Sequence, residues 1–364
     1  MYVSQLGEQW HRARVEPGVV HLDSAAAGRS SNAVIEAMTA HLWRESKRGS
    51  YVAAADRAEQ LSRYRDDLAQ LIGHRPDEVS FHDSARSALR ALLSSWDLPA
   101  PTTVWVATNE FGPNLLEFER RGFAVRPLPD ADVHGRVDVD ALDDMLQSEQ
   151  PTFIHVCQIG SMSGVVQPVG PIVEIAHRAG IPVVIDMAQS AGHVPTVTGA
   201  DIVYGTSRKW LTGPRGVGFA AVRVDALRPV EIESSETFIA GLLGLGIAVS
   251  EIEKMGQHNV FRELAAVGHT TRERLDGVGG WEVVEPVDEP SATVTLAPPS
   301  DGQIPDVIAA RDKLLGQGLL VTAAESWRAP LSSGRSVLRV SPHLDVRHED
   351  LDRLAEALRA MRSV

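Results

Sequence analysis

Short apolar runs alternate with amphipathic segments over the first two thirds of the chain. Seven of these runs predict strands, at 79–82, 103–108, 123–128, 152–158, 181–186, 201–206 and 216–224. Helical periodicity between them predicts helices at 84–95, 114–121, 139–147 and 172–179. Apolar strands that alternate with helices are typical of βαβ units, in which both faces of a parallel sheet are covered. We therefore expect an α/β unit with a mainly parallel seven-stranded sheet.

The pattern changes after residue 229. A long helix is predicted over about 240–275, followed by strands at 281–286, 292–297, 319–324 and 337–342 and by helices near 304–315 and 348–361. This mixture is typical of a small α+β unit. Because domains usually hold about 100–200 residues, we expect an N-terminal arm (1–20), a large unit (21–235) and a small C-terminal unit (236–364).

Composition and charge narrow the possible functions. The chain has 364 residues, of which 43% are hydrophobic and 23% charged, as in ordinary globular proteins. Its formal charge of −13 disfavours nucleic acid and anionic membranes as partners. The first residues lack the apolar stretch of a signal peptide, so we expect a cytoplasmic location. A single cysteine, Cys157, excludes an internal disulfide and a multi-cysteine zinc site, and no metal is expected.

The motif IDMAQSAG contains the first candidate, Asp186, at the end of an apolar strand. In open α/β sheets, ligands bind at the carboxyl ends of the strands. A carboxylate at that place can hold the positive charge of a buried heterocycle. The alternatives are a helix N-cap, for which aspartate is favoured, and a metal ligand.

The motif GTSRKWLTGPRGVGF places Lys209 in a glycine-rich loop 23 residues after Asp186. Thr206, Ser207 and Arg208 precede the lysine and supply hydroxyl and guanidinium donors for an anion. Neighbouring cations lower a lysine pKa, which suits Schiff-base chemistry. Taken alone, Lys209 would be read as an exposed loop lysine, because lysines are mostly exposed.

The motif FHDSARSALRALL predicts a third piece, a helix that begins at Ser84, Ala85 and Arg86 directly after a strand. Free N–H groups at such a helix start can bind a phosphate, although a plain N-cap explains the serine as well. A strand-end carboxylate, a lysine and a phosphate cradle are together what pyridoxal phosphate (PLP) requires.

With these motifs the chain resembles the class V aminotransferase and cysteine desulfurase superfamily of type I PLP enzymes. The resemblance extends from HLDSAAAG to the final helix and rests on D-x-x-Q-S-A-G followed by a lysine and Gly-Pro-x-Gly-x-G. It implies the PLP-dependent transferase type I fold, pyridoxal 5'-phosphate as cofactor and a homodimer. The apolar helix start at 239–249 is expected between the subunits.

The resemblance also implies a role for individual residues. Lys209 would bind the cofactor as a Schiff base, Asp186 would pair with the pyridine nitrogen, and Gln189 would contact the ring 3-oxygen. The phosphate would be held by Ser84, Ala85, Arg86, Thr206 and Arg208. Phe111 in TNEFGPN would stack on the ring, unless it is simply a buried aromatic at a helix start. Ser161, or Gln158 in its place, would also touch the ring oxygen.

Substrate residues follow from the same resemblance. Arg339 in VLRVSPHLDV would clamp the α-carboxylate of an amino-acid substrate, the alternative being a surface arginine on a strand. Ala26 and Gly28 would line the substrate entrance, or form a simple turn. If the substrate side chain carries a trimethylammonium group, aromatic rings would contact it through cation–π interactions. The candidates for this contact are Trp43, Tyr51 and Phe238.

The reaction is less constrained by the motifs. Lys209 would remove the α-proton as a general base. A cysteine desulfurase needs a nucleophilic cysteine near the small unit, but Cys157 lies in the apolar strand TFIHVCQ, whereas a carbon–sulfur lyase needs none.

Four segments resemble most closely the actinobacterial PLP enzymes of ergothioneine biosynthesis: TNEFGPN, CQIGSMSGVVQPVGPI, GTSRKWLTGPRGVGFA and ETFIAGLLGLGIAV. That resemblance implies β-elimination of hercynylcysteine S-oxide, a cysteine sulfoxide conjugate, to an ergothioneine precursor, pyruvate and ammonia. The alternatives are an aminotransferase, a kynureninase-like hydrolase, an epimerase or a cysteine desulfurase. A non-catalytic PLP-fold binding protein is disfavoured because Lys209, Asp186 and Arg339 are all present.

Overall fold

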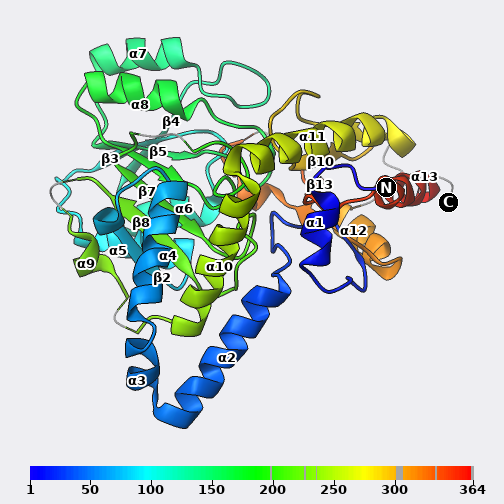
Figure 1. Ribbon diagram of the computed structural model, residues 1–364. Helices are drawn as coiled ribbons and strands as arrows, with labels where there is room; N and C mark the ends of the chain where they lie inside the picture. The colour runs from blue at the N-terminus through cyan, green and yellow to red at the C-terminus, as the bar shows by residue number, and fades with distance from the viewer. Residues whose placement is uncertain (197–198, 225–226, 235, 301–305, 333, 362–364) are drawn as a thin grey trace.

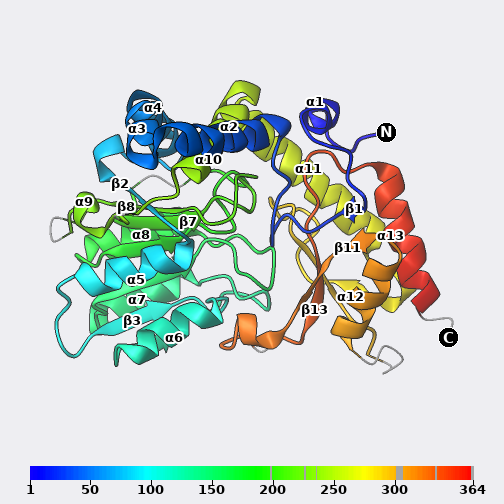
Figure 2. The same cartoon turned by 90° about the horizontal axis from the view of Figure 1, so that it is seen from below.

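The computed structural model describes residues 1–196, 199–224, 227–234, 236–300, 306–332 and 334–361. A large layered α/β part lies beside a smaller α+β part (Figures 1 and 2). Among the described residues, no helix is long and apolar enough to cross a membrane.

The large part is built on a seven-stranded sheet in the order β2-β8-β7-β6-β5-β3-β4. Its strands are β2 (Val79–His82), β3 (Thr103–Val106), β4 (Ala124–Pro127), β5 (Phe153–Cys157), β6 (Val183–Asp186), β7 (Ile202–Thr206) and β8 (Gly218–Val222). All seven predicted strands are confirmed. Neighbouring strands pair in parallel from β4 to β7, and β8 is antiparallel to both of its neighbours. The sheet is therefore mainly parallel, as expected.

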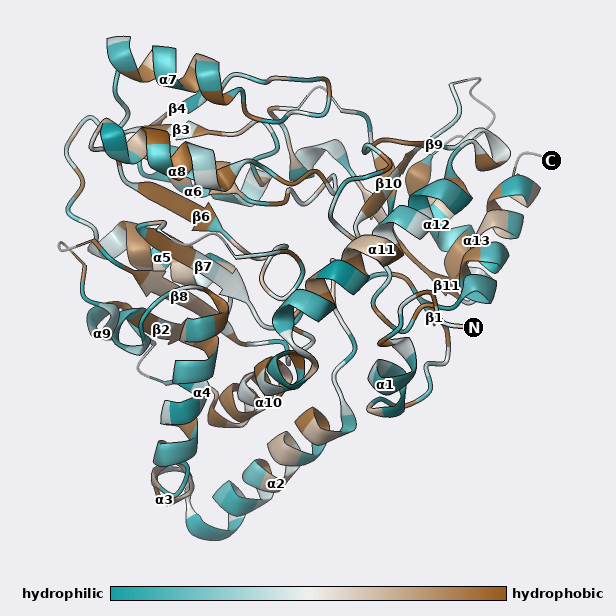
Figure 3. Cartoon of the chain, turned by 45° about the horizontal axis from the view of Figure 1, so that its top comes forward, coloured by the Kyte–Doolittle hydropathy of each residue, from teal (hydrophilic) through white to brown (hydrophobic). Residues whose placement is uncertain are grey.

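Helices cover both faces of this sheet, so its middle is hydrophobic while the outer helix faces are polar (Figure 3). One face packs on α5 (Ala85–Ser95), α6 (Gly112–Arg120) and α9 (Pro229–Ile232), and the other on α4 (Ala58–Leu71), α7 (Val139–Ser148) and α8 (Val169–Arg178). Alternate residues of β6 point to opposite faces. Val184 packs on the face covered by α5, α6 and α9, whereas Val183 and Ile185 pack on the face covered by α4, α7 and α8. This double burial explains why the strands are apolar without interruption.

A second helical layer includes segments for which the sequence pattern predicted no helix. It contains α2 (Asn32–Arg48), α3 (Ser50–Ala55) and α10 (Ile239–Met255), and α10 packs against α2 and α4. Ten residues of α10 are buried within this one chain. The expectation that the apolar stretch 239–249 lies between subunits is therefore wrong for most of its surface. Gly246 permits this packing, since a Cβ there would meet the Tyr64 ring at 2.0 Å.

The long helix predicted over 240–275 is in fact two helices. Gly256 has a φ of +78°, a backbone conformation that favours glycine, and it ends α10 and begins α11 (Gln257–Leu275). Helix α11 continues across to a four-stranded antiparallel sheet of order β12-β13-β10-β9. The strands of this sheet are β9 (Glu282–Val283), β10 (Val294–Ala297), β12 (Thr322–Ala324) and β13 (Val337–Val340).

The N-terminal residues lie against the small sheet. Helix α1 (Gly7–Arg12) is followed by β1 (Val20–His21), which pairs in parallel with β11 (Leu319–Leu320). Because β11 pairs with β1, the single strand predicted at 319–324 is divided into β11 and β12. Helices α12 (Val307–Gly316) and α13 (His348–Met361) complete this part. The predicted start of α12, at 304–305, lies outside the described residues, and the division of the chain at residue 235 stays a prediction.

Candidate active site

A cavity of about 400 Å³ opens where β5, β6 and β7 end. Twelve of the thirteen site residues predicted from the sequence line it: Ala26, Ser84, Ala85, Arg86, Phe111, Ser161, Asp186, Gln189, Thr206, Arg208, Lys209 and Arg339. Segments far apart in the sequence therefore meet at the carboxyl edge of the sheet, where ligands are expected to bind.

One end of the cavity is the start of α5. Ser84 caps this helix, and its hydroxyl accepts from the backbone N–H of Ser87 at 3.1 Å. Among the described residues, no acceptor is bound to the backbone N–H groups of Ala85 and Arg86. A Cβ at Gly218, the first residue of β8, would meet the Ser84 carbonyl carbon at 2.3 Å. Glycine at this position therefore lets the start of β8 lie close to the helix cap. Two free N–H groups at a helix start form a natural phosphate cradle.

Asp186 ends β6 with three donors on its carboxylate. Oδ1 accepts from the backbone N–H of Ala188 at 2.8 Å, and Oδ2 accepts from Asn114 Nδ2 and the Tyr204 hydroxyl, both at 3.1 Å. The aspartate is buried apart from 7% of its surface and lines the cavity. These three donors fix the carboxylate in a place where it can pair with a protonated ring nitrogen.

Lys209 lies in the loop after β7 and faces the same cavity. Its pKa is lowered to about 7, mainly by burial; Asp186 opposes this shift, and the nearby cations Arg208 and Arg339 add to it. At neutral pH a substantial share of this lysine is therefore a neutral amine. A neutral amine is the nucleophilic form that Schiff-base formation requires.

This low pKa predicts the pH dependence of cofactor capture. The rate at which apoenzyme binds PLP covalently should rise with pH through about 7 and level off above it. An unperturbed lysine would keep gaining rate to a pH of about 10.4. Stopped-flow absorbance of PLP mixed with apoenzyme measures the rate, and Arg339→Gln should move the midpoint to higher pH. A wild-type rate that still climbs through pH 9 would contradict the assignment.

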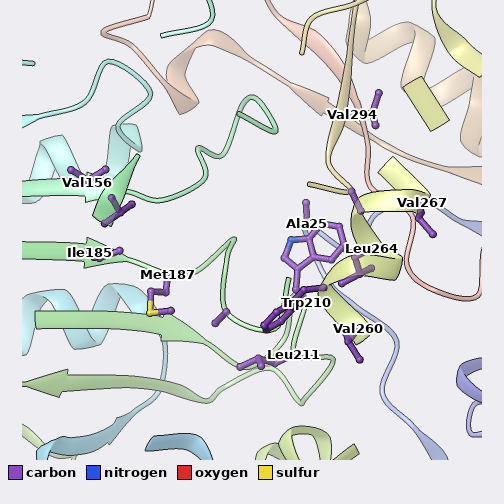
Figure 4. Packing of buried hydrophobic residues seen from close by; sticks show 14 of the residues in the cluster. Ala25, Val156, Ile185, Met187, Trp210, Leu211, Val260, Leu264, Val267 and Val294 are labelled. Atoms are coloured by element: carbon purple, nitrogen blue, oxygen red, sulfur yellow. The ribbon is translucent and has the colours of Figure 1, made fainter. Parts of the chain in front are cut away.

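The residue after the lysine anchors the loop. Trp210 is fully buried beside Val260 and Leu264 of α11, as Figure 4 shows, and it stacks on His193 with ring centroids 3.6 Å apart. Its indole N–H donates to Gln189 Oε1 at 3.1 Å. The indole thus ties the lysine loop to both the sheet and the small part. Sequence inspection had assigned no role to this tryptophan.

Gly28 is the predicted site residue that does not line the cavity. Its N–H donates to the Arg208 carbonyl at 2.7 Å, and a Cβ would meet the Lys209 carbonyl oxygen at 2.3 Å. The absence of a side chain therefore brings the N-terminal segment against the backbone of the lysine loop. Gly28 supports the loop by packing, and its expected contact with substrate has no support in the geometry.

Gln189 and Ser161 have protein partners as well as cavity contact. Gln189 donates through Nε2 to the Ala25 carbonyl at 2.9 Å, which leaves one amide hydrogen for a ligand. Ser161 is buried and its hydroxyl accepts from Arg328 at 3.3 Å. Gln158, the alternative to Ser161, donates to the Pro195 carbonyl and is not among the residues that line the cavity.

Arg339 enters the cavity from β13 of the small sheet. Its Nη1 donates to the Ser161 carbonyl at 2.6 Å, while its Nη2 lies 3.6 Å from Asp23. Its buried Nε has no partner among the described residues. Burial lowers its pKa to about 10, which leaves the guanidinium charged at neutral pH. A buried guanidinium with an unused donor is suited to a carboxylate.

A buried network behind Asp186 was missed by the sequence analysis. Glu110 Oε2 accepts from His155 Nδ1 at 2.7 Å, and His155 Nε2 lies 2.9 Å from the Tyr204 hydroxyl, which donates to Asp186. Burial alone would lower the pKa of His155, but the charge and hydrogen bond of Glu110 raise it above its ordinary value. Asn114 also joins Glu110 to Asp186, with an Nδ2–Oε1 distance of 2.9 Å.

Comparison with known proteins identifies the family. Residues 20–354 match the family model described as "Aminotransferase class-V". The chain belongs to this family. A Mycobacterium tuberculosis (strain CDC 1551 / Oshkosh) protein named "Probable hercynylcysteine sulfoxide lyase" is 39% identical over 97% of this chain and 93% of its own length.

Solved structures agree on the fold of this class V enzyme. A cysteine desulfurase of Escherichia coli superimposes with a TM-score of 0.84 at 19% identity, over 98% of both chains. A cystine C–S lyase in complex with cysteine persulfide superimposes with a TM-score of 0.81 at 17% identity, over 94% of this chain and 97% of that one. The expected type I fold is confirmed, and the chain is an enzyme whose cofactor is PLP.

The residues present fit that cofactor. The free N–H groups of α5, with Thr206 and Arg208, match a phosphate, and the carboxylate of Asp186 matches a ring nitrogen. Lys209 is the amine that would hold the aldehyde carbon.

A second cavity of about 390 Å³ lies between the N-terminal segment and α13. Arg29, which lines it, is already paired with Asp345 and so is not a free cation for a ligand.

Proposed function

We propose that this enzyme is a carbon–sulfur lyase that cleaves hercynylcysteine sulfoxide by β-elimination, giving pyruvate, ammonia and the sulfenic acid precursor of ergothioneine. The observation that carries the proposal is the 39% identity, over nearly the whole chain, to the M. tuberculosis protein. PLP supplies the electron sink for the carbanion at Cα. The substrate class is an amino acid with a sulfoxide on Cβ.

Three residues of the cavity would have separate roles in this reaction. Arg339 would hold the substrate α-carboxylate, because its buried guanidinium has a free donor. Lys209, with a pKa of about 7, would take the α-proton at neutral pH. Phe111, which lines the cavity from the N-cap of α6, would cover one face of the cofactor ring.

The geometry of Cys157 favours a lyase over a cysteine desulfurase. Its thiol donates to Glu110 at 3.2 Å, and burial raises its pKa well above the ordinary value. A thiol held neutral in this way is a poor nucleophile, because the thiolate is the reactive form. A desulfurase needs a cysteine to receive sulfur, and this chain has no other.

Product analysis tests the proposal. The PLP-loaded enzyme should release pyruvate fastest from hercynylcysteine sulfoxide when offered cysteine, hercynylcysteine, S-methylcysteine sulfoxide and kynurenine in parallel. A thiol-bearing imidazole should appear after reduction of the products. Release of alanine and sulfide from cysteine, or of anthranilate from kynurenine, would instead assign the desulfurase or hydrolase reaction.

The same proposal includes a cytoplasmic homodimer. Single-cysteine chains need no oxidising compartment, which agrees with a cytoplasmic location.

Large apolar side chains on α2 and α3 are exposed, although scattered single ones are common on any surface. They are Ile35, Leu42, Trp43, Tyr51 and Val52. Trp43 and Tyr51, considered for substrate contact, do not line the cavity of their own chain, nor does Phe238.

We therefore expect Trp43→Glu to weaken the dimer. The indole is 64% exposed in the single chain, so a charge there should leave the fold intact while opposing burial against a partner. Light scattering after size exclusion should show wild-type enzyme at twice the chain mass and the variant shifted toward a monomer. Leu315→Glu, on the exposed side of α12, is the matched control. An unchanged dimer in Trp43→Glu would remove α2 from the interface.

A further inference from the structure

The cavity is lined by more positive charge than the cofactor and one substrate carboxylate account for. Of the described residues that line it, five are arginines and Asp186 is the one acid. Arg86 is paired with a glutamate of α6, Arg208 lies beside the lysine, and Arg339 faces the expected carboxylate. Arg215 and Arg328 have no task in the chemistry proposed so far, and of these two Arg215 is exposed whereas Arg328 is partly buried.

Arg328 ends the short 3₁₀ helix Ser326–Arg328 that precedes β13. Its Nη1 donates to the Ser161 hydroxyl at 3.3 Å, and its buried Nε has no partner among the described residues. The carbonyl of the same serine accepts from Arg339 Nη1 at 2.6 Å. Two guanidinium groups that contact one serine lie close enough to bind neighbouring atoms of one small ligand.

The substrate chemistry says which atoms these are. When Arg339 binds the α-carboxylate, the next atoms along the substrate are Cα, Cβ and the sulfoxide sulfur. We propose that Arg328 donates to the sulfoxide oxygen and stabilises the negative charge that develops there as the carbon–sulfur bond breaks. This inference rests on the proposed lyase function and names the residue that activates its leaving group.

The electron balance of the step supports a cationic donor at this place. The α-proton goes to Lys209, the pair it leaves behind forms the Cα–Cβ double bond, and the Cβ–S pair departs with sulfur. The departing group is a sulfenate, R–SO⁻, whose charge rests largely on oxygen. The aminoacrylate left behind takes up water to give pyruvate and ammonia, so no oxidant or reductant is needed. A fixed donor aimed at the developing charge accelerates such a step.

Two substrates with different leaving groups test the inference. Arg328→Gln should lower kcat/KM for the cysteine sulfoxide by about 100-fold or more, the usual effect of removing one oxyanion donor. The same variant should keep kcat/KM for β-chloroalanine within a few-fold, because chloride leaves without an oxygen to stabilise. Arg328→Lys should restore part of the sulfoxide activity. Arg335→Gln, an exposed arginine between the 3₁₀ helix and β13, is the matched control.

Binding provides a readout that does not depend on turnover. Cysteate carries sulfonate oxygens where the substrate carries its sulfoxide, and alanine carries none. Titration of the cofactor absorbance should show that Arg328→Gln weakens cysteate by about tenfold or more, as expected for a charge-assisted hydrogen bond, and leaves alanine unchanged.

The outcomes separate the inference from the function on which it rests. Equal losses for the sulfoxide and β-chloroalanine, or equal losses for cysteate and alanine, would mean that Arg328 only supports the site, and would overturn the inference. No loss for either pair would overturn it as well. Wild-type enzyme that eliminates chloride but cleaves no cysteine sulfoxide would overturn the proposed function itself, and the inference with it.

Discussion

Replacing Lys209 with alanine is expected to abolish turnover, with kcat falling by roughly 10⁴-fold or more. The estimate combines a lost general base, worth about 10²–10⁴-fold, with the lost covalent attachment of the cofactor. The lysine lies in the cavity with Asp186 and Arg339, so no other described lysine can take its place. Lys313→Ala, an exposed lysine on α12, should keep wild-type activity.

Two further readouts keep this prediction independent of activity. The variant should lose the absorbance of covalently bound PLP, and gel filtration without excess cofactor should remove PLP from the variant.

The apoprotein of the variant should also be more stable than wild-type apoprotein. The pKa of Lys209 is lowered to about 7, so the cost of burying the charged amine is present in full below that pH.

The sign of this stability effect follows from the direction of the shift. As pH rises from about 7 towards the ordinary lysine value of about 10.4, the folded protein has already lost the proton that the unfolded chain still binds. The stability of wild-type apoprotein therefore climbs in that range and approaches that of the variant. Full activity in Lys209→Ala, or a stability difference that does not change with pH, would contradict the assignment.

The strand ends and the lysine loop could be predicted from the sequence because each has a local signal. Asp186 ends an apolar run, and Lys209 follows the next one, so both were expected at one edge of the sheet. The order of the strands has no such signal. Only the register shows that Cys157 lies opposite Asp186 and that Asp186 lies opposite Tyr204.

The network behind Asp186 was missed for the same reason. His155 and Tyr204 stand as single polar residues in apolar strands, and Glu110 follows another strand. A buried polar side chain needs a partner, so each could have been marked, but their pairing needs the order of β5, β6 and β7. Helices α2 and α4 were missed because their polar faces weaken the apolar pattern.

Glu110→Gln is expected to destabilise the protein strongly, by about 3–5 kcal/mol, the usual cost of breaking a buried ion pair. Glu110 and His155 are both fully buried, and their Oε2–Nδ1 distance is 2.7 Å. Oε1 of the same carboxylate accepts from the Phe111 backbone, Asn114 and the Cys157 thiol. Glutamine keeps the shape, removes the charge and replaces one acceptor oxygen with a donor. Glu149→Gln, whose partner Arg126 is half-exposed, should cost less than about 1 kcal/mol.

The pH dependence identifies the charge as the cause. The pKa of His155 is raised in the folded protein, so its stabilising contribution is complete below the unfolded value of about 6.5. The contribution is lost as pH rises through the folded pKa. The difference in thermal midpoint between wild type and Glu110→Gln should therefore be largest in mild acid and shrink in base. A constant difference would show that Glu110 acts through shape and hydrogen bonds alone.

The effect should reach the cofactor site through Asp186. Its Oδ2 depends on Asn114 and Tyr204, and Glu110 and His155 in turn hold those two side chains. Once Glu110 is neutral, only the charge of Asp186 opposes the lowering of the His155 pKa by burial, and the Tyr204 hydroxyl loses a charged donor. We therefore expect Glu110→Gln to bind PLP more weakly even where it is folded, as measured by titration of apoenzyme below its thermal midpoint. If the variant is destabilised but binds PLP with wild-type affinity, the network supports the fold only and does not position Asp186 for the cofactor.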